Sequence, residues 1–324
     1  MSAPFRVLAI DGGGIRGVIP ATVLVELERR LAPRRLAAVF DLIVGTSTGG
    51  IIALGLTVPD REHPRNPAER LLEFYLSDGE TIFPGGGPVP LARSAWLREG
   101  TRYSVTGLEE ALYRFLGDTP LTAALTGVVL TSYDLAYGEP IVLSSRPELG
   151  DVSDVTMVVA ARATSAAPMF FKPQIVQDGD RERMLVDGGL YANSPALLGY
   201  LIGGQAAARE KRPLALVSLG TGTRPLRAPL PVADRAPMRD VSAAARTILE
   251  AVATGGGRLA HLLLARLADG EQLRYWRLQT TVGPCSFTMD DSSPANVACL
   301  YERACGLVSE ADEELSAIAQ VLAG

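Results

Sequence analysis

Histidine and lysine are scarce in this 324-residue chain, which contains only His63 and His261 and only Lys172 and Lys211. A catalytic triad with a histidine base would have to recruit one of the two histidines. No run of basic residues occurs among the 31 lysines and arginines, and the formal net charge is −5. These features argue against nucleic acid as a partner and against strong electrostatic docking to anionic membranes. The predominance of arginine over lysine indicates a GC-rich genome and hence a bacterial source.

Cysteine and long hydrophobic runs are also rare. The three cysteines are Cys285, Cys299 and Cys305. Their spacing matches no metal motif, and their odd number leaves one unpaired in any disulfide scheme, so we expect buried or inert thiols in a reducing compartment. The N-terminus has no secretory signal pattern, and no apolar run is long enough to cross a bilayer. Together these absences predict a cytoplasmic protein.

Glycine and apolar residues, by contrast, are abundant and are arranged in alternating strand and helix patterns. The chain has 33 glycines, and 47% of its residues are hydrophobic, enough for a large core. Strands are expected at residues 6–10, 42–45, 127–133, 141–144, 184–186, 214–219 and 275–279. The C-terminal segment, about residues 295–323, has the periodicity of a solvated amphipathic helix. We expect one domain over residues 1–324, a three-layer α/β/α fold with a mostly parallel central sheet.

A serine lies between two apolar runs, residues 39–44 and 51–56. The segment Gly45-Thr-Ser47-Thr-Gly49 has the G-x-S-x-G pattern of a nucleophile elbow, in which a strand turns sharply into a helix. A serine on so tight a turn needs neighbours with almost no side chain, and Gly45 and Gly49 meet that requirement. We therefore predict that Ser47 is a catalytic nucleophile.

Three consecutive glycines, Gly12, Gly13 and Gly14, follow the first expected strand and precede a helix expected from residue 19 to about residue 31. Backbone N–H groups that converge near a helix N-terminus suit an anion or a developing oxyanion. The spacing of Gly12, Gly14 and Gly17 also matches the dinucleotide fingerprint G-x-G-x-x-G. That fingerprint requires an acidic residue closing a second strand, yet the segment after Gly17 reads as a helix and then the strand before Ser47. We favour an oxyanion hole over NAD binding.

A carboxylate, Asp187, ends the expected strand at residues 184–186 and precedes two glycines. There it is placed to meet a group from another strand end, although an aspartate in such a turn often only caps the loop. His63 lies in a charged, proline-broken stretch that is typical of a surface loop. His261 lies in a helical pattern, but the order Ser47, Asp187, His261 is that of an α/β-hydrolase triad. We favour a dyad in which Asp187 accepts the Ser47 proton directly, with the triad as the alternative.

Three segments resemble the signatures of the patatin-like phospholipases: residues 11–17 (DGGGIRG), 45–50 (GTSTGG) and 187–189 (DGG). Residues 161–168, 217–222 and 289–291 also look like patatin segments in the same order, so the resemblance extends from residue 5 to about residue 298. It implies a calcium-independent lipid acyl hydrolase without cofactor or metal, in which Ser47 attacks an ester carbonyl and Asp187 is the base. Gly12 to Gly14 and Arg16 would stabilise the oxyanion, although Arg16 could equally hold the loop by hydrogen bonds to carbonyls.

An apolar segment interrupted by glycine and proline, residues 82–91, is expected to be a flexible loop. With Trp96, its residues Ile82 and Phe83 are candidates for a lid or lipid-contacting flap, and an ordinary surface loop is the alternative. The expected partners are a phospholipid or other acyl-ester lipid and, transiently, a membrane surface. Two further interpretations stay open: a serine esterase for soluble acyl esters, and a ligand-activated phospholipase effector of bacterial antiviral defence.

Overall fold

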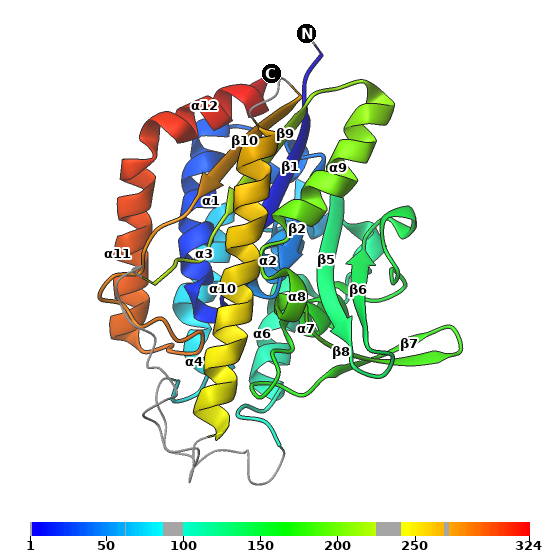
Figure 1. The fold of residues 1–324 in the computed structure, drawn as a ribbon, viewed down its shortest axis with the longest axis vertical. Coiled ribbons are helices and arrows are strands. Elements are labelled where there is room, and N and C mark those ends of the chain that lie inside the picture. The colour runs from blue at the N-terminus through cyan, green and yellow to red at the C-terminus, as the bar shows by residue number, and fades with distance from the viewer. Residues whose placement is uncertain (1, 62, 87–99, 225–240, 269–271) are drawn as a thin grey trace.

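The computed structural model describes residues 2–61, 63–86, 100–224, 241–268 and 272–324. Its centre is an eight-stranded sheet in the order β10-β9-β1-β2-β5-β8-β7, with β6 paired to β5 (Figure 1). The four pairs from β10 to β5 are parallel, and the three pairs that involve β6, β7 and β8 are antiparallel. The strands are β1 (Phe5–Ile10), β2 (Leu42–Thr46), β5 (Gly127–Asp134), β6 (Glu139–Ser144), β7 (Gln174–Asp178), β8 (Arg181–Asp187), β9 (Leu214–Leu219) and β10 (Leu273–Leu278). A small separate sheet pairs β3 (Pro59–Asp60) with β4 (His63–Pro64).

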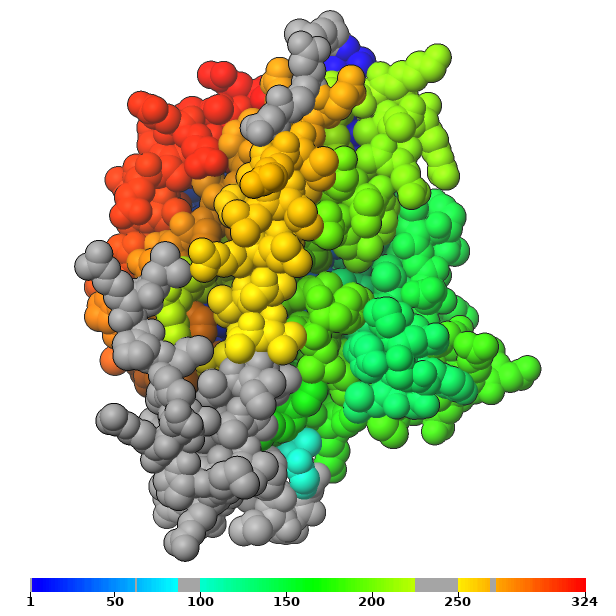
Figure 2. Space-filling view, in the orientation of Figure 1, coloured from blue at the N-terminus to red at the C-terminus, as the bar shows by residue number. Residues whose placement is uncertain are grey.

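Helices cover both faces of the sheet, so the expected three-layer α/β/α fold is confirmed. The α-helices are α1 (Val18–Leu31), α2 (Thr48–Thr57), α3 (Ala68–Ser77), α4 (Gly79–Ile82), α6 (Thr106–Leu116), α7 (Met157–Ser165), α8 (Gly189–Ala192), α9 (Ala196–Glu210), α10 (Val241–Leu267), α11 (Pro294–Glu310) and α12 (Asp312–Ala323). Short 3-10 turns are η1 (Gly14–Gly17), η2 (Leu36–Ala38), η4 (Leu121–Ala123) and η5 (Pro147–Leu149). Helices α9 and α10 lie on one face, where α10 forms part of the molecular surface (Figure 2).

The hydrophobic core has two parts, and side chains of β1 point alternately into one and the other. Val7 and Ala9 join the cluster under α9, whereas Leu8 and Ile10 join the larger cluster that contains α1 and α2. Successive side chains of a strand point to opposite faces, so a strand that is apolar at every position requires cover on both sides. Gly203 of α9 lets that helix approach closely, since a Cβ there would lie 2.5 Å from Val7 Cγ2.

The C-terminal segment differs from the single solvated helix that we expected. It forms two helices, α11 and α12, separated at Ala311. Both pack against α1, and their buried faces include Leu300 and Leu315. None of the helices in the described ranges is both long and apolar enough to span a bilayer.

The cysteines also differ from the expectation. Cys285 and Cys299 form a disulfide with their Cα atoms 5.6 Å apart, and Cys305 is a free, exposed thiol. The prediction of three buried or inert thiols is therefore wrong, because the loop after β10 folds back onto α11, a contact that the spacing of 14 residues does not reveal. The reducing compartment inferred from these thiols loses its support.

Candidate active site

Strand register brings Ser47 and Asp187 to the same level of the sheet. Thr46, the last residue of β2, is opposite Thr131 on β5, and the next residue of β5, Ser132, is opposite Asp187 on β8. Ser47 follows Thr46 directly, so the predicted nucleophile and base flank the same point of β5. The Ser47 hydroxyl lies near enough to the Asp187 carboxylate to lower the pKa of that carboxyl.

The turn at Ser47 has the geometry of a nucleophile elbow. Ser47 has φ 55° and ψ −123°, a conformation that L-residues rarely adopt, between β2 and the first residue of α2. A Cβ at Gly45 would overlap the backbone of Gly49, and a Cβ at Gly49 would overlap the Ile10 carbonyl. The Ser47 N–H donates to Thr164 Oγ1 at 2.9 Å. These contacts explain why the turn needs small neighbours.

Asp187 is only 6% exposed, and two groups act on its carboxylate. The Gly189 N–H donates to Oδ1 at 2.7 Å, and the Ser47 hydroxyl lies close to the same carboxylate. Burial disfavours the charged form and raises the pKa of Asp187 to about 6, while the Ser47 hydroxyl and the Gly189 N–H oppose the rise. An aspartate with this pKa is a stronger base than an ordinary one and is still ionised at neutral pH.

The glycine loop presents two free amides beside this pair. The Gly12 N–H donates to the Asn193 carbonyl at 2.9 Å, so Gly12 does not fit the expected role of oxyanion donor. The amides of Gly13 and Gly14 have no acceptor in the described part of the chain. The loop lies close to Ser47, since a Cβ at Gly12 would be 3.1 Å from Ser47 Cβ. Two of the three predicted donors thus remain available for an anion.

Arg16 is buried and directed at backbone carbonyls. Its Nε donates to Gly13 O at 3.2 Å and its Nη1 to Gly222 O at 3.4 Å, while its guanidinium stacks on Phe287 at 4.1 Å from the ring centroid. Burial, the largest effect on this group, lowers the pKa of Arg16 to about 10, which leaves it charged at neutral pH. These contacts match the loop-holding alternative rather than the oxyanion role.

Two supports of the loop were not predicted. Arg277 of β10 forms a two-bond ion pair with Asp11, one bond through Nη1 at 3.0 Å and the other through Nη2. The Met289 carbonyl accepts the Ile15 N–H at 2.8 Å. Both partners come from the last fifty residues of the chain, and no local pattern connects them with the loop.

Neither histidine is among the residues that line the pocket at Ser47. His261 lies on the exposed face of α10, where its Nδ1 is 3.3 Å from Tyr275 Oη. His63 is exposed on β4. Across the described residues, no group of three or more histidine, cysteine, aspartate or glutamate side chains could hold a metal ion.

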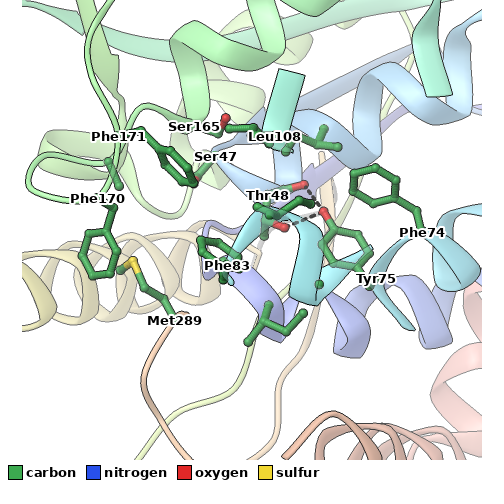
Figure 3. A pocket seen from close by; sticks show the side chains of 16 residues that line it. Ser47, Thr48, Phe74, Tyr75, Phe83, Leu108, Ser165, Phe170, Phe171 and Met289 are labelled. Atoms are coloured by element: carbon green, nitrogen blue, oxygen red, sulfur yellow. Dashed lines mark hydrogen bonds between the residues drawn. The ribbon is translucent and has the colours of Figure 1, made fainter. Parts of the chain in front are cut away.

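Ser47 lines an apolar pocket that is open to solvent (Figure 3). Its lining residues are Gly14, Ile15, Ser47, Thr48, Ile51, Phe74, Tyr75, Gly79, Ile82, Phe83, Leu108, Ser165, Ala167, Phe170, Phe171 and Met289. None of these side chains carries a charge. Phe83 was among the predicted lid residues, but Phe74, Tyr75, Phe170 and Phe171 were not predicted as site residues, because their helical or loop context is the same as that of ordinary core residues.

Of the predicted lid, the structure describes Ile82 and Phe83, whereas residues 87–91 of the predicted loop lie outside the described residues. Ile82 ends α4 and Phe83 follows it, and both are buried wall residues of the pocket rather than parts of a flexible loop. Phe83 packs against Tyr103 and Phe171, with ring centroids 5.4 and 5.8 Å away, and these contacts fix its position. Trp96 lies outside the described residues.

The sequence is similar to that of known proteins over the part of the chain that contains Ser47 and Asp187. The family model described as patatin-like phospholipase matches residues 8–200. Patatin-like protein 2 of Arabidopsis thaliana is 37% identical over 242 residues, which are 67% of this chain and 59% of that protein. Patatin-17 of Solanum cardiophyllum is 35% identical over 245 residues, 67% of this chain and 60% of that protein. The chain thus spans about three-fifths of the length of these relatives.

Two solved structures are similar at low sequence identity. Human GIVD cytosolic phospholipase A2 aligns with 99% of this chain and 60% of its own, with TM-score 0.44 and 12% identity. VipD from Legionella pneumophila aligns with 95% of this chain and 67% of its own, with TM-score 0.34 and 14% identity. The family model covers more than half of the chain, including the turn at Ser47 and the strand end at Asp187. The chain belongs to the patatin-like phospholipase family.

Proposed function

We propose that this protein is a calcium-independent lipid acyl hydrolase of the phospholipase A or lysophospholipase type. The observation that carries the proposal is the Ser47 hydroxyl beside the Asp187 carboxylate, with Ser47 in the lining of an uncharged, apolar pocket. The pair supplies a nucleophile and a base, and the pocket suits a fatty acyl chain. The matched family, described as patatin-like phospholipase, supports the lipid substrate.

In the first step, Asp187 takes the hydroxyl proton of Ser47 as the serine oxygen attacks the ester carbonyl. The new oxyanion accepts hydrogen bonds from the free N–H groups of Gly13 and Gly14. The tetrahedral species collapses, the proton on Asp187 passes to the departing alcohol oxygen, and the acyl group stays on Ser47. The raised pKa of Asp187 suits both transfers, because the group must bind and release a proton in one cycle.

Water completes the reaction. Asp187 takes a proton from water as the water oxygen attacks the acyl-enzyme carbonyl, and the same amides hold the second oxyanion. Collapse releases the fatty acid, and Ser47 recovers its proton from Asp187. Ser47, Asp187 and the two glycine amides therefore suffice for both halves of the cycle without a metal.

The pocket selects the acyl part of the substrate rather than its headgroup. Transfer of a charged phosphate into an apolar pocket without a partner is strongly unfavourable, and no lining side chain among the described residues offers a charge. The phosphate or other headgroup therefore stays outside while the acyl chain enters. The same lining accepts the acyl chain of a soluble ester, which keeps the esterase alternative testable.

The test is release of free fatty acid from mixed phospholipid micelles with a calcium chelator present, for wild type, Ser47→Ala and Asp187→Asn. We expect release by wild type and a loss of at least about a thousandfold in both variants. Ser77→Ala, at the exposed end of α3, is the matched control and should behave as wild type. Wild type that cleaves only a soluble nitrophenyl ester would favour the esterase, and no Ser47-dependent cleavage of either substrate would contradict the proposal.

A further inference from the structure

Thr48, the residue after Ser47, is joined to Tyr75 of α3 by two hydrogen bonds. Tyr75 of α3 donates its hydroxyl proton to the Thr48 carbonyl at 3.0 Å, and its Oη lies 2.5 Å from Thr48 Oγ1 (Figure 3). A tyrosine hydroxyl has one proton, so the Thr48 hydroxyl must donate in the second bond. Burial raises the pKa of Tyr75, which keeps it a neutral donor.

The glycine loop leaves room for this contact. A Cβ on Gly17 would lie 2.6 Å from Thr48 Oγ1 and 2.6 Å from Tyr75 Cε1. Real Cβ atoms do not approach other atoms so closely, so a side chain at Gly17 would displace one of these groups. The end of the glycine loop, the start of α2 and α3 therefore meet at the Tyr75 hydroxyl.

The contact acts on a strained backbone. The φ of 55° at Ser47 is maintained only if its surroundings hold the chain on both sides. On the N-terminal side, Thr164 Oγ1 accepts the Ser47 N–H at 2.9 Å and itself donates to Thr131 O at 2.7 Å. On the C-terminal side, Tyr75 holds both the carbonyl and the hydroxyl of Thr48.

The backbone N–H of Thr48 is a further candidate hydrogen-bond donor for the oxyanion. Thr48 is the first residue of α2, and its N–H has no acceptor among the residues that the structure describes. In other enzymes with a nucleophile elbow, the amide after the nucleophile contributes to the oxyanion hole. Fixing Thr48 thus fixes a third candidate donor as well as the direction of Ser47.

We propose that Tyr75 is a positioning residue that acts through Thr48 to hold Ser47 and the Thr48 amide in their reactive arrangement. The inference rests on the proposed function, because it concerns the same nucleophile. Tyr75 does not touch the reacting atoms, and its ring is an uncharged wall of the pocket. Loss of its hydroxyl should therefore slow the chemical step and leave substrate binding nearly unchanged.

The experiment measures kcat and KM for a soluble nitrophenyl ester, with the rate of Ser47→Ala subtracted as background. Tyr75→Phe keeps the ring and should lower kcat about tenfold with KM within about twofold. Thr48→Val should do the same, and the double variant should lose about tenfold rather than about a hundredfold, because both changes break one pair of hydrogen bonds. Thr48→Ser keeps the hydroxyl and should restore most of kcat.

Thr57→Val is the matched control for a merely structural effect. It removes another buried threonine hydroxyl of α2, which donates to Ala53 O at 2.8 Å, far from Ser47 along the helix. It should lower the melting temperature without lowering kcat. An unchanged kcat in Tyr75→Phe, multiplicative losses in the double variant, or an equal loss of kcat in Thr57→Val would each overturn the inference while leaving the proposed function intact. If Ser47→Ala hydrolysed the ester as fast as wild type, the proposed function itself would fail, and this inference with it.

Discussion

At the scale of single residues, burial makes Asp187 the most consequential titratable group of the site. Its carboxylate is almost completely removed from solvent, and its charged form is favoured by the Gly189 N–H and the nearby Ser47 hydroxyl. Carboxylates with ordinary solvation titrate near pH 4, whereas this one titrates near pH 6. The burial that raises the pKa therefore has two consequences: activity should fall at low pH, and the fold should be less stable when the carboxylate is charged.

The pH limit predicts the activity profile. The base must be ionised to accept the Ser47 proton, so kcat/KM for an uncharged ester should be constant above about pH 7 and fall as the pH decreases through about 6. His261→Ala is the control, and it should reproduce the wild-type profile because this residue lies on the exposed face of α10. A profile that stays flat down to pH 4 would contradict the role of Asp187. Loss of activity in folded His261→Ala would instead support the triad.

Burial of the Asp187 charge lowers the stability of the fold, so a variant without this charge should be more stable. The folded-state pKa of about 6 exceeds the ordinary value of 3.8, so the folded protein binds the extra proton, and its free energy of unfolding falls as the pH rises from about 4 to about 6. A difference of two pKa units lowers the free energy of unfolding by roughly 3 kcal/mol once the pH is above both pKa values. Asp187→Asn removes the buried charge and should gain about 1–3 kcal/mol at pH 8 in urea unfolding, with a smaller gain at pH 4. Lower stability of the variant at pH 8 would mean that the carboxylate stabilises the fold.

How far the sequence predicts the site depends on the residue. Ser47, Asp187 and the glycines stand in compact patterns, because a tight turn and a close backbone approach restrict the residue types nearby. Arg277 and Tyr75 carry no such pattern, since an arginine in a strand and a tyrosine in an amphipathic helix are usual in any α/β protein. Their roles depend on which segments the fold brings together.

At the scale of elements, the central strands were predicted well because they are buried on both faces and read as continuous apolar runs. Residues 214–219 coincide with β9. The edge strand β7 was missed, since Gln174–Asp178 has only two apolar residues, which are adjacent, and one face of the strand is exposed. The break between α11 and α12 was missed because the apolar periodicity continues across Ala311.

The loop between β10 and α11 gives a prediction at this scale. Its disulfide, Cys285–Cys299, encloses about fifteen residues, including Met289, and a loop of that length is worth about 3 kcal/mol in chain-entropy terms. Cys285→Ser/Cys299→Ser, or wild type with a reductant, should therefore unfold at lower urea concentration. Cys305→Ser removes only the exposed free thiol and should unfold as wild type does. Titration of three free thiols in the native, unreduced protein would contradict the disulfide.

At the scale of the whole molecule, the site depends on parts of the chain far apart in sequence. The family model ends at residue 200, yet β9 is the neighbour of β1, and Arg277 and Met289 support the glycine loop. The sheet order explains this, because the chain returns to the other side of β1 after forming β2, β5 and β8. The glycine loop follows β1, beside the point where the strand order reverses, and sites in open α/β sheets form at such points. The last third of the molecule is thus part of the active-site scaffold.

The central claim is that Ser47 is the nucleophile that carries the acyl group, and that Asp187 activates Ser47 without calcium. An alkyl fluorophosphonate, added with a chelator and followed by intact mass and peptide mapping, tests this most directly. We predict one adduct per chain, on Ser47, in wild type and His261→Ala, much slower labelling in Asp187→Asn and none in Ser47→Ala. An adduct on another residue, labelling that requires calcium, or equal rates in wild type and Asp187→Asn would contradict the account.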